Sequence, residues 1–233
     1  MTAARTRNPV DVRVYLVGGD TGGRDLAQVA AAAVAGGATI VQARDKSVDH
    51  AALTSQTAGL QARLGDRVPV IVNDDPAVAA TTRAGLHVGP DDLHPAAARE
   101  LLGPDVIIGW SIHDPAQLAD TAAVAACDYL AASPVWPTPS KTDTTAPLGP
   151  AGVGALRAGM PADLPLVAIG GIDQTNAAAV IAAGADGVAV ISAICAAEDP
   201  RAAAARLRAV VDRALADRID TGAAAPLTME ESR

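Results

Sequence analysis

The sequence predicts an α/β protein whose single domain is a (β/α)8 TIM barrel, and three observations support this prediction. Short apolar runs alternate eight times with alanine-rich helical stretches, and strict alternation of this kind is typical of a closed parallel barrel. The 233 residues are 50% hydrophobic, which suits one sizeable core. Aromatic residues make up only 2%, so Val, Ile, Leu and Ala must fill that core, as they do in parallel strands buried on both faces.

The predicted strands are short and mostly apolar. In chain order they are residues 12–17, 39–43, 69–73, 85–88, 106–111, 128–132, 166–169 and 187–190. Several helical stretches open with Asp or Pro, which are typical of helix starts; these stretches are 24–35, 49–64, 75–83, 95–101, 115–126, 150–157, 174–183 and 200–216. A doubly wound sheet is the alternative, but the sequence lacks the clear dinucleotide fingerprint that would favour it.

The barrel domain is expected to span residues 12–217. An N-terminal extension at 1–11 precedes it, and a polar tail at 218–233 follows, which we expect to be disordered. The connection 133–149 is long, rich in proline and without helical periodicity. Long loops in compact domains are often lids or binding loops, so we expect this one to close over the site.

Charge and cysteine content narrow the ligand class and the compartment. A formal net charge of −8 and the scarcity of aromatics argue against nucleic-acid binding. Cys127 and Cys195 lie far apart, which predicts thiols in a reducing compartment. No signal peptide and no run of about 18 apolar residues is found, so we predict a cytoplasmic protein without membrane contact. The expected partners are small phosphorylated molecules, and a homo-oligomer is compatible with the sequence.

Charged and polar residues gather where the predicted strands end, which is where such barrels assemble their active sites. Gln42, Arg44 and Lys46 close the second strand, and an amide with two cations can hold a polyphosphate. A solvated charged turn is an equally good interpretation of this segment taken alone.

Acidic residues follow the third and fourth strands. Asp74 comes after Asn73 at the end of the third strand, and Asp91 and Asp92 follow the fourth. An Asn-Asp pair more commonly caps the next helix. Two carboxylates from neighbouring strand ends, close to a basic patch, nevertheless match the way proteins hold Mg²⁺ together with substrate phosphates. We therefore expect a magnesium-assisted subsite for a diphosphate.

Ser111 closes the fifth strand, where its hydroxyl could donate to a phosphate or cap the following helix. His87 and His113 are candidates for acid–base chemistry. No nucleophile or carboxylate has the spacing of a triad with them, so a structural role or a position merely near the site is favoured.

The ends of the seventh and eighth strands predict a second anion subsite. Gly170 and Gly171 follow the seventh strand, and Ile191 and Ser192 follow the eighth. This is the usual phosphate position in (β/α)8 barrels, where backbone amides bind the anion. Two subsites at one barrel mouth predict an enzyme that joins two phosphorylated molecules, one of which loses diphosphate.

Six segments, in order over about residues 12–215, resemble the thiamine-phosphate synthase family. They are Val-Gln-Ala-Arg-Asp-Lys at 41–46, Asn-Asp at 73–74, Gly-Leu-His-Val-Gly-Pro-Asp-Asp-Leu at 85–93, Gly-Trp-Ser at 109–111, Asp-Tyr at 128–129 through Ser-Pro-Val-Trp-Pro-Thr-Pro-Ser-Lys at 133–141, and Ile-Gly-Gly-Ile at 169–172. The resemblance implies an enzyme that condenses 4-amino-2-methyl-5-(diphosphooxymethyl)pyrimidine with 4-methyl-5-(2-phosphoethyl)thiazole, or its carboxylated form. The products would be thiamine phosphate and diphosphate, with Mg²⁺ required.

The resemblance also implies the roles of individual residues. The pyrimidine diphosphate would be held by Gln42, Arg44, Lys46, Asn73, Ser111 and Lys141, with Ala43 and Asp45 in the same binding segment. Mg²⁺ would be bound by Asp74 and Asp92. The thiazole phosphate would be received by Thr138, Pro139, Ser140, Gly171, Ile191 and Ser192. The catalytic residues would be Arg44, Lys46, Ser111 and Lys141, which assist a dissociative departure of diphosphate, without a protein nucleophile.

The chain departs from the family pattern at several positions. The second-strand motif more usually reads Gln-Leu-Arg-Glu-Lys, so Ala43 and Asp45 are smaller and shorter; Trp136 stands where Phe is common, and Ser140 where Thr is common. A thiazole tautomerase of the same barrel type and a non-catalytic thiamine-phosphate binder are the rival hypotheses. Because the residues for diphosphate and metal are retained, the synthase is favoured. The glycine-rich segment 18–23 receives no role.

Overall fold

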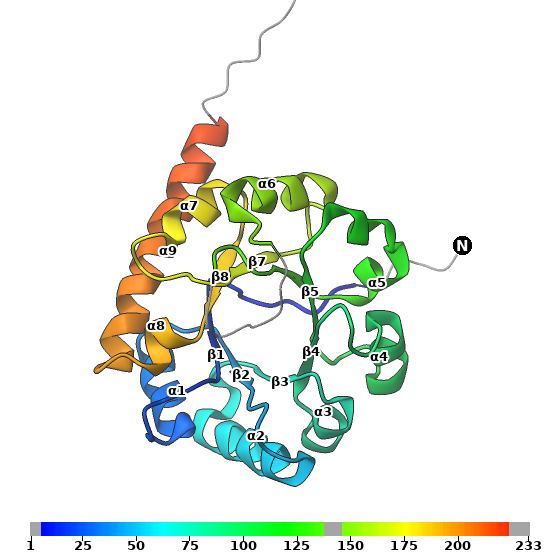
Figure 1. The fold of residues 1–233 in the computed structure, drawn as a ribbon, viewed down its shortest axis with the longest axis vertical. Coiled ribbons are helices and arrows are strands. Elements are labelled where there is room, and N and C mark those ends of the chain that lie inside the picture. Colours follow the sequence, from blue (N-terminus) through cyan, green and yellow to red (C-terminus); the bar gives the residue numbers. More distant parts are fainter. Residues whose placement is uncertain (1–5, 138–145, 224–233) are drawn as a thin grey trace, which may run out of the picture.

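A computed structural model describes residues 6–137 and 146–223, with side chains described as far as Asp220. Eight parallel strands pair in chain order, and β1 closes on β8, which makes a complete barrel surrounded by helices (Figure 1). The strands are β1 Val14–Val17, β2 Ile40–Ala43, β3 Val70–Asn73, β4 Gly85–Val88, β5 Ile108–Ile112, β6 Tyr129–Ala132, β7 Leu166–Ile169 and β8 Gly187–Val190. Each coincides with a predicted strand, so the predicted fold class is confirmed.

The helices occupy the predicted intervals with a few differences. They are α1 Leu26–Ala35, α2 His50–Leu64, α3 Pro76–Thr82, α4 Pro95–Leu102, α5 Thr121–Ala126, α6 Gly149–Gly159, α7 Ala177–Ala182 and α9 Pro200–Ala223, with the short α8 Ser192–Cys195 and the 3₁₀ turns η1 Gly65–Arg67 and η2 Pro115–Ala119. The single helix predicted at 115–126 is divided at Asp120. That residue leaves the helical conformation and caps α5 by accepting from the Ala123 backbone N–H.

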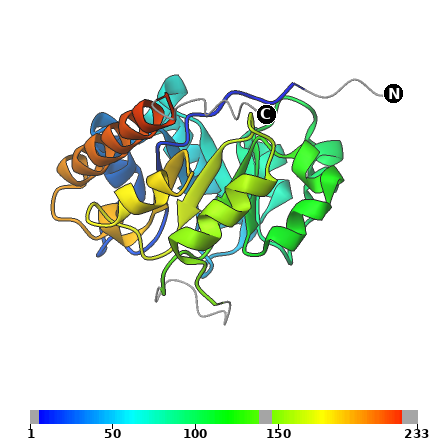
Figure 2. The same cartoon turned by 90° about the horizontal axis from the view of Figure 1, so that it is seen from above.

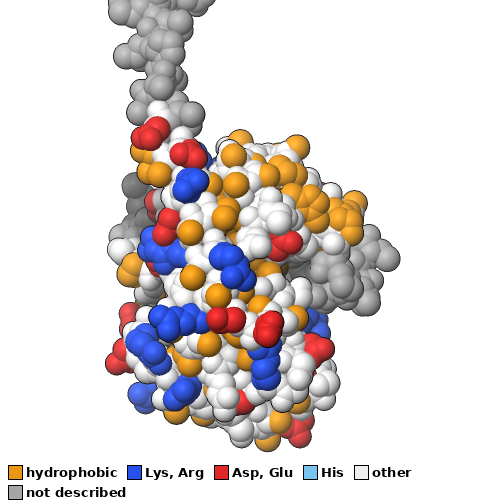
Figure 3. All heavy atoms as spheres, turned by 90° about the vertical axis from the view of Figure 1, so that its left-hand side faces the viewer, with side chains coloured by type: hydrophobic (Ala, Val, Ile, Leu, Met, Phe, Trp, Pro, Cys, Tyr) orange, Lys and Arg blue, Asp and Glu red, His pale blue; other side chains and the backbone are white. Residues whose placement is uncertain are grey.

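Helix α9 extends beyond the predicted end of the barrel domain at residue 217. It continues to Ala223, so residues 218–223 are helical where a disordered tail was expected. Arg218 explains the extension: its guanidinium donates to the backbone carbonyls of Ile181 and Ala185 and to the carboxylate of Asp186. On the side of the molecule where α9 lies, basic and acidic side chains are interspersed (Figure 3). Residues 224–233 lie outside the described part of the chain.

The core has two layers. Between the strands and the helices lies a large aliphatic cluster. Inside the barrel lies a smaller cluster that includes Ile40, Ile71, Val167 and two of the few aromatic residues, Tyr15 and Tyr129. Both tyrosines are almost fully buried, at 1% and 0% exposure. The barrel is therefore a packed core rather than a channel, as expected for eight strands.

The N-terminal segment crosses the end of the barrel where the strands begin (Figure 2). Asn8 fixes it there, because its backbone N–H donates to Asp128 Oδ1 at 2.8 Å and its amide donates to the carbonyls of Pro104 and Val106. Asp128 is completely buried and also accepts from Arg99 at 2.7 Å and from the Ile108 N–H at 2.9 Å. This cluster, which we call the closed-end cluster, joins the extension to the turns that precede β5 and β6.

Within the part of the chain that the structure describes, no helix has the length and apolar character needed to cross a membrane.

Candidate active site

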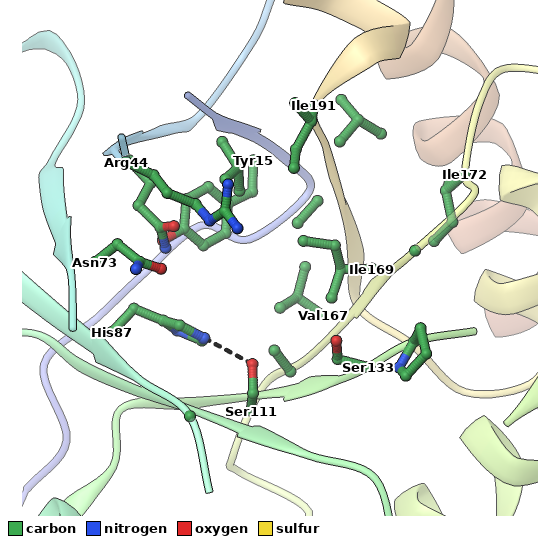
Figure 4. A pocket seen from close by; sticks show the side chains of 18 of the residues that line it. Tyr15, Arg44, Asn73, His87, Ser111, Ser133, Val167, Ile169, Ile172 and Ile191 are labelled. Carbon is green, nitrogen blue, oxygen red and sulfur yellow. Dashed lines mark hydrogen bonds between the residues drawn. The ribbon is translucent and has the colours of Figure 1, made fainter. Parts of the chain in front are cut away.

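A cavity of about 860 Å³ opens at the carboxyl ends of the strands. Figure 4 shows that its wall has two different halves. Arg44, Asn73, His87 and Ser111 stand on one side, and aliphatic side chains such as Ile169 stand on the other. We call these the polar half and the apolar half. The polar half comes from β2 to β5, and the apolar half comes from β7 and β8.

Strand β2 sends alternate side chains into the cavity. Gln42 and Arg44 line it, together with Lys46 from the following turn. Ala43, between them, faces outward and is completely buried in the aliphatic cluster under the helices, because successive side chains of a strand point to opposite faces. Asp45 accepts hydrogen bonds from the backbone and hydroxyl of Ser47, which lower the pKa of its carboxyl. The structure thus brings neither Ala43 nor Asp45 to the cavity, although both were predicted to bind substrate.

Asp74 and Asp92 lie together in the polar half, as predicted. Asp74 has a φ of 63°, a left-handed conformation that is uncommon outside glycine, and its N–H donates to the His87 carbonyl at 2.9 Å. Asp92 is held by the Gly89 N–H, which donates to its Oδ2 at 2.7 Å. Lys46 Nζ lies 3.9 Å from Asp74 Oδ2. A strained backbone at this position suggests that function, rather than stability, sets its conformation.

The electrostatics of this pair suit a cation. Burial and the contact with the Asp92 carboxyl together raise the pKa of Asp74 to about 6, although the Lys46 ammonium acts to lower it. Two crowded carboxylates fit a hard divalent ion that takes its other ligands from phosphate and water. Among the described residues, no group of three or more His, Cys, Asp or Glu side chains could hold a metal.

His87 belongs to the hydrogen-bond network of the site, whereas the sequence favoured a structural role or a position merely near the site. Its Nε2 lies 2.8 Å from Ser111 Oγ (Figure 4). Its Nδ1 lies 3.0 Å from the hydroxyl of Tyr129. Its ring also stacks on the Tyr129 ring, with centroids 5.6 Å apart. The signal was available in the sequence, because His87 is a polar residue between the outward-facing Leu86 and Val88 of a predicted strand.

The long β6–α6 connection is fixed at its base. The backbone N–H groups of Val135 and Trp136 donate to the carbonyls of Ile169 and Gly170, at 2.9 and 3.1 Å. The returning end is fixed as well, since the Leu148 N–H donates to the Pro134 carbonyl at 2.9 Å. The predicted residues Thr138, Pro139, Ser140 and Lys141 lie outside the described residues, whereas Ser133 and Pro134 line the cavity.

Gly171, Ile191 and Ser192 meet at the apolar half, as predicted. Gly171 has a φ of 64°, and a Cβ there would lie only 2.9 Å from the Cβ of Trp136, so glycine is required. The glycine-rich β1–α1 loop packs against the same region. A Cβ at Gly19 would lie 2.2 Å from Ile191 Cγ2, which gives that loop a structural role: its backbone supports the β8 loop at close range.

The comparisons with known proteins identify the family of this chain. A model of the thiamine monophosphate synthase family matches residues 14–194. A thiamine-phosphate synthase from Albidiferax ferrireducens is 45% identical over 205 residues, which are 86% of this chain and 92% of the relative. Another from Xanthobacter autotrophicus is 47% identical over 208 residues, covering 87% and 97%. The chain belongs to the thiamine monophosphate synthase family. The family and the enzyme class predicted from the sequence are confirmed.

Solved structures place the barrel in the thiamine monophosphate synthase family too. The thiamine phosphate pyrophosphorylase from Pyrococcus furiosus superposes with a TM-score of 0.78 at 31% identity, covering 88% of this chain and 98% of that one. A 3-hexulose-6-phosphate synthase superposes with a TM-score of 0.62 at 18% identity, which shows a shared fold alone.

Proposed function

We propose that the protein condenses the pyrimidine diphosphate with the thiazole phosphate to give thiamine phosphate and diphosphate. The observation that carries the proposal is one cavity with a polar half, built around Arg44, Lys46 and two carboxylates, opposite an apolar half closed by glycine turns. Curated relatives of this length that carry the name thiamine-phosphate synthase support the same reaction.

The polar half would hold the pyrimidine diphosphate. Arg44 offers a bidentate fork and Lys46 a point charge to the phosphate oxygens, while Asn73 adds amide contacts. As the bond between the methylene carbon and the diphosphate oxygen breaks, the oxygen keeps the electron pair. The two cations then stabilise the developing negative charge, which is the main contribution a preorganised site can make. Ser111 and Gln42 would contact the ring that carries this methylene group.

Asp74 and Asp92 are the residues that would hold Mg²⁺. When bound, the ion would supply leaving-group charge stabilisation. Lys46 lies on the same side, so its ammonium can offset the charge of these carboxylates before the substrate arrives.

The apolar half would receive the thiazole phosphate. Gly171, Ile191 and Ser192 lie where backbone amides can bind its phosphate, with Thr138, Pro139 and Ser140 as further candidates. The thiazole nitrogen then uses its lone pair to form the new C–N bond, so no protein nucleophile is needed. Lys141 would assist diphosphate departure from the loop. Orientation of the two substrates is the second contribution of the protein.

The setting of the reaction is also part of the proposal. Both cysteines are buried as thiols, which fits a cytoplasmic enzyme. Its partners would be the two small phosphorylated substrates, and association into a homo-oligomer stays a prediction.

The decisive experiment incubates the purified protein with both phosphorylated substrates, with Mg²⁺ or with a chelator. We expect equal amounts of thiamine phosphate and diphosphate, formed only with the metal. Thiazole phosphate that binds or isomerises without any diphosphate release would refute the proposal and favour a tautomerase or a binding protein.

A further inference from the structure

A chain of hydrogen-bonded polar side chains runs through the otherwise aliphatic interior of the barrel. Gln42 Nε2 donates to the Tyr15 hydroxyl at 2.7 Å, and the Tyr15 and Tyr129 hydroxyls are 3.0 Å apart. The chain continues from Tyr129 to His87 Nδ1 at 3.0 Å and from His87 Nε2 to Ser111 Oγ at 2.8 Å. We call these five residues the interior relay. Its two ends, Gln42 and Ser111, both line the cavity.

The relay is buried and held in place by packing. None of its five members is more than 8% exposed. The Tyr15 and Tyr129 rings meet edge to face with centroids 5.8 Å apart, and His87 stacks on Tyr129. Gly109 on β5 makes room for this arrangement, since a Cβ there would lie 2.0 Å from Tyr129 Cζ. Within the barrel, these polar groups hydrogen-bond to one another in sequence.

With Gln42 Nε2 as the donor to Tyr15, one continuous direction of hydrogen bonding runs along the relay. The amide Nε2 can only donate, so Tyr15 accepts from Gln42 and its single hydrogen goes to Tyr129. Tyr129 then donates its own hydrogen to His87 Nδ1, which places the imidazole hydrogen on Nε2, where it is donated to Ser111. Two groups at the ends are thereby assigned to the cavity: the Gln42 carbonyl oxygen as an acceptor and the Ser111 hydroxyl as a donor.

We propose that the interior relay makes its Gln42 end a hydrogen-bond acceptor and its Ser111 end a hydrogen-bond donor. The cavity thereby selects a heteroaromatic ring that carries an amino group beside an unprotonated ring nitrogen. The amino group donates to Gln42, and the ring nitrogen accepts from Ser111. Tyr15, Tyr129 and His87 are positioning residues in this scheme. The proposal rests on the proposed function, whose pyrimidine carries such an edge.

The relay also separates this site from a serine nucleophile. A Ser–His pair at 2.8 Å resembles the activated serine of hydrolases, in which the imidazole accepts the serine proton. In the direction that starts from Gln42 Nε2 as donor, His87 Nε2 carries hydrogen and so does not accept one from Ser111. The partner on the other nitrogen is also the hydroxyl of Tyr129 rather than a carboxylate.

The first test measures binding by calorimetry of two diphosphates: the aminopyrimidine and its 4-oxo analogue, whose edge has donor and acceptor exchanged. We expect the wild type to prefer the amino compound by about 100-fold or more, as sites built around hydrogen bonds do. Tyr15→Phe and Tyr129→Phe each interrupt the relay and release its ends, so the preference should fall below about tenfold, with binding of the thiazole phosphate unchanged. Undiminished preference in both variants would overturn the proposal.

A matched control removes a buried hydroxyl elsewhere. Thr57 is fully buried in α2 and donates to the Leu53 carbonyl at 2.8 Å, away from the cavity. Thr57→Val should leave the preference between the two ligands unchanged. An equal loss in this control would attribute the effect to general destabilisation and overturn the positioning role.

A second measurement does not depend on the reaction. Nitrogen-15 shifts of the imidazole, assigned through the loss of the His87 signals in His87→Gln, report which ring nitrogen carries hydrogen. We expect the neutral Nε2–H form in the wild type and a mixture of both forms in Tyr129→Phe. An Nδ1–H or a doubly protonated ring in the wild type would refute the relay direction, even if thiamine phosphate is formed. The expected tautomer without any product would refute only the proposed function.

Discussion

Buried carboxylates occur at both ends of the barrel, but their surroundings differ. Asp128, in the closed-end cluster, is fully buried and accepts from Arg99, Asn8 and Ile108. Asp74, at the cavity, keeps a third of its side chain exposed and faces a second carboxylate, with one ammonium at the limit of ion-pair distance. The first charge has several protein donors, whereas the second has a like charge beside it and a single ammonium at 3.9 Å.

This difference indicates that Asp128 serves the stability of the fold and that Asp74 serves the cavity. A buried charge with several donors contributes to stability only as a complete set, because removing a partner leaves the charge uncompensated. Two crowded carboxylates lower the stability of the free protein and regain it when a cation binds. Substitutions at the closed end should therefore lower the unfolding free energy and leave the reaction unchanged, whereas substitutions at the cavity should impair the reaction without lowering the unfolding free energy. Four predictions test this contrast.

The largest effect is expected at the closed end. Arg99→Ala removes the guanidinium from Asp128 and from several carbonyls, and should cost about 3–5 kcal/mol of unfolding free energy. Urea unfolding measures it, with Arg63→Ala on the exposed face of α2 as the control expected to change little. Substrate KM values of the folded fraction should be those of the wild type. A stability loss no larger than that of the control would mean that Asp128 does not need its partner.

At the cavity, Asp74→Ala should act on the reaction instead. Loss of one of two carboxylates should lower metal-dependent kcat on the order of 10²- to 10³-fold. Unfolding free energy without metal should stay the same or rise, because a like-charge contact is removed. Steady-state rates and thermal unfolding check both parts, with the exposed Asp66→Ala as control. Wild-type turnover in Asp74→Ala would remove the metal assignment.

The raised pKa of Asp74, about 6, predicts a pH dependence of metal binding. Below this value the carboxyl is protonated in the metal-free protein, so Mg²⁺ affinity should fall by up to about tenfold per pH unit. The same group favours folding when protonated, and this contribution is lost as pH rises through about 6. Titrations with Mg²⁺ between pH 5 and 8 are the measurement. An affinity that stays constant over this range would contradict the crowded-pair interpretation.

The smallest effect is expected for Asn8→Ala. The backbone bond to Asp128 survives, and only the side-chain donations to Pro104, Val106 and Asp128 are lost. The expected cost is about 1 kcal/mol of unfolding free energy, with no change in kcat. Thermal unfolding at matched protein concentration checks it. A loss as large as that of Arg99→Ala would show that the extension, rather than the ion pair, holds the closed end together.

Much of the fold could be predicted because each barrel strand is a short apolar run ended by a polar residue. Valine-rich runs such as 70–73 leave little ambiguity. The break at Asp120 could not be foreseen, since one aspartate served equally well as a helix residue or as a new cap. The end of α9 was missed because its last turn is polar and depends on tertiary contacts of Arg218.

The site was predicted in outline, from strand ends and from the family resemblance, but not in the direction of its side chains. Ala43 was included because it adjoins contacting residues, although alternation along β2 turns it away from the cavity. The roles of Tyr15 and Tyr129 were missed because both lie within strands apolar on both faces, where inward and outward positions look alike. Only three-dimensional closure of the barrel brings their hydroxyls together.

The tethering of the β6–α6 connection has an evolutionary consequence. Val135 and Trp136 pair with β7, and the Leu148 and Gly149 N–H groups return to the carbonyls of Pro134 and Val135. Both ends are thus anchored independently of the sequence between them. Such a segment can be exchanged or lengthened at a modest entropic cost that grows only with the logarithm of its length. Grafting this connection between relatives should therefore leave the barrel and its folding the same.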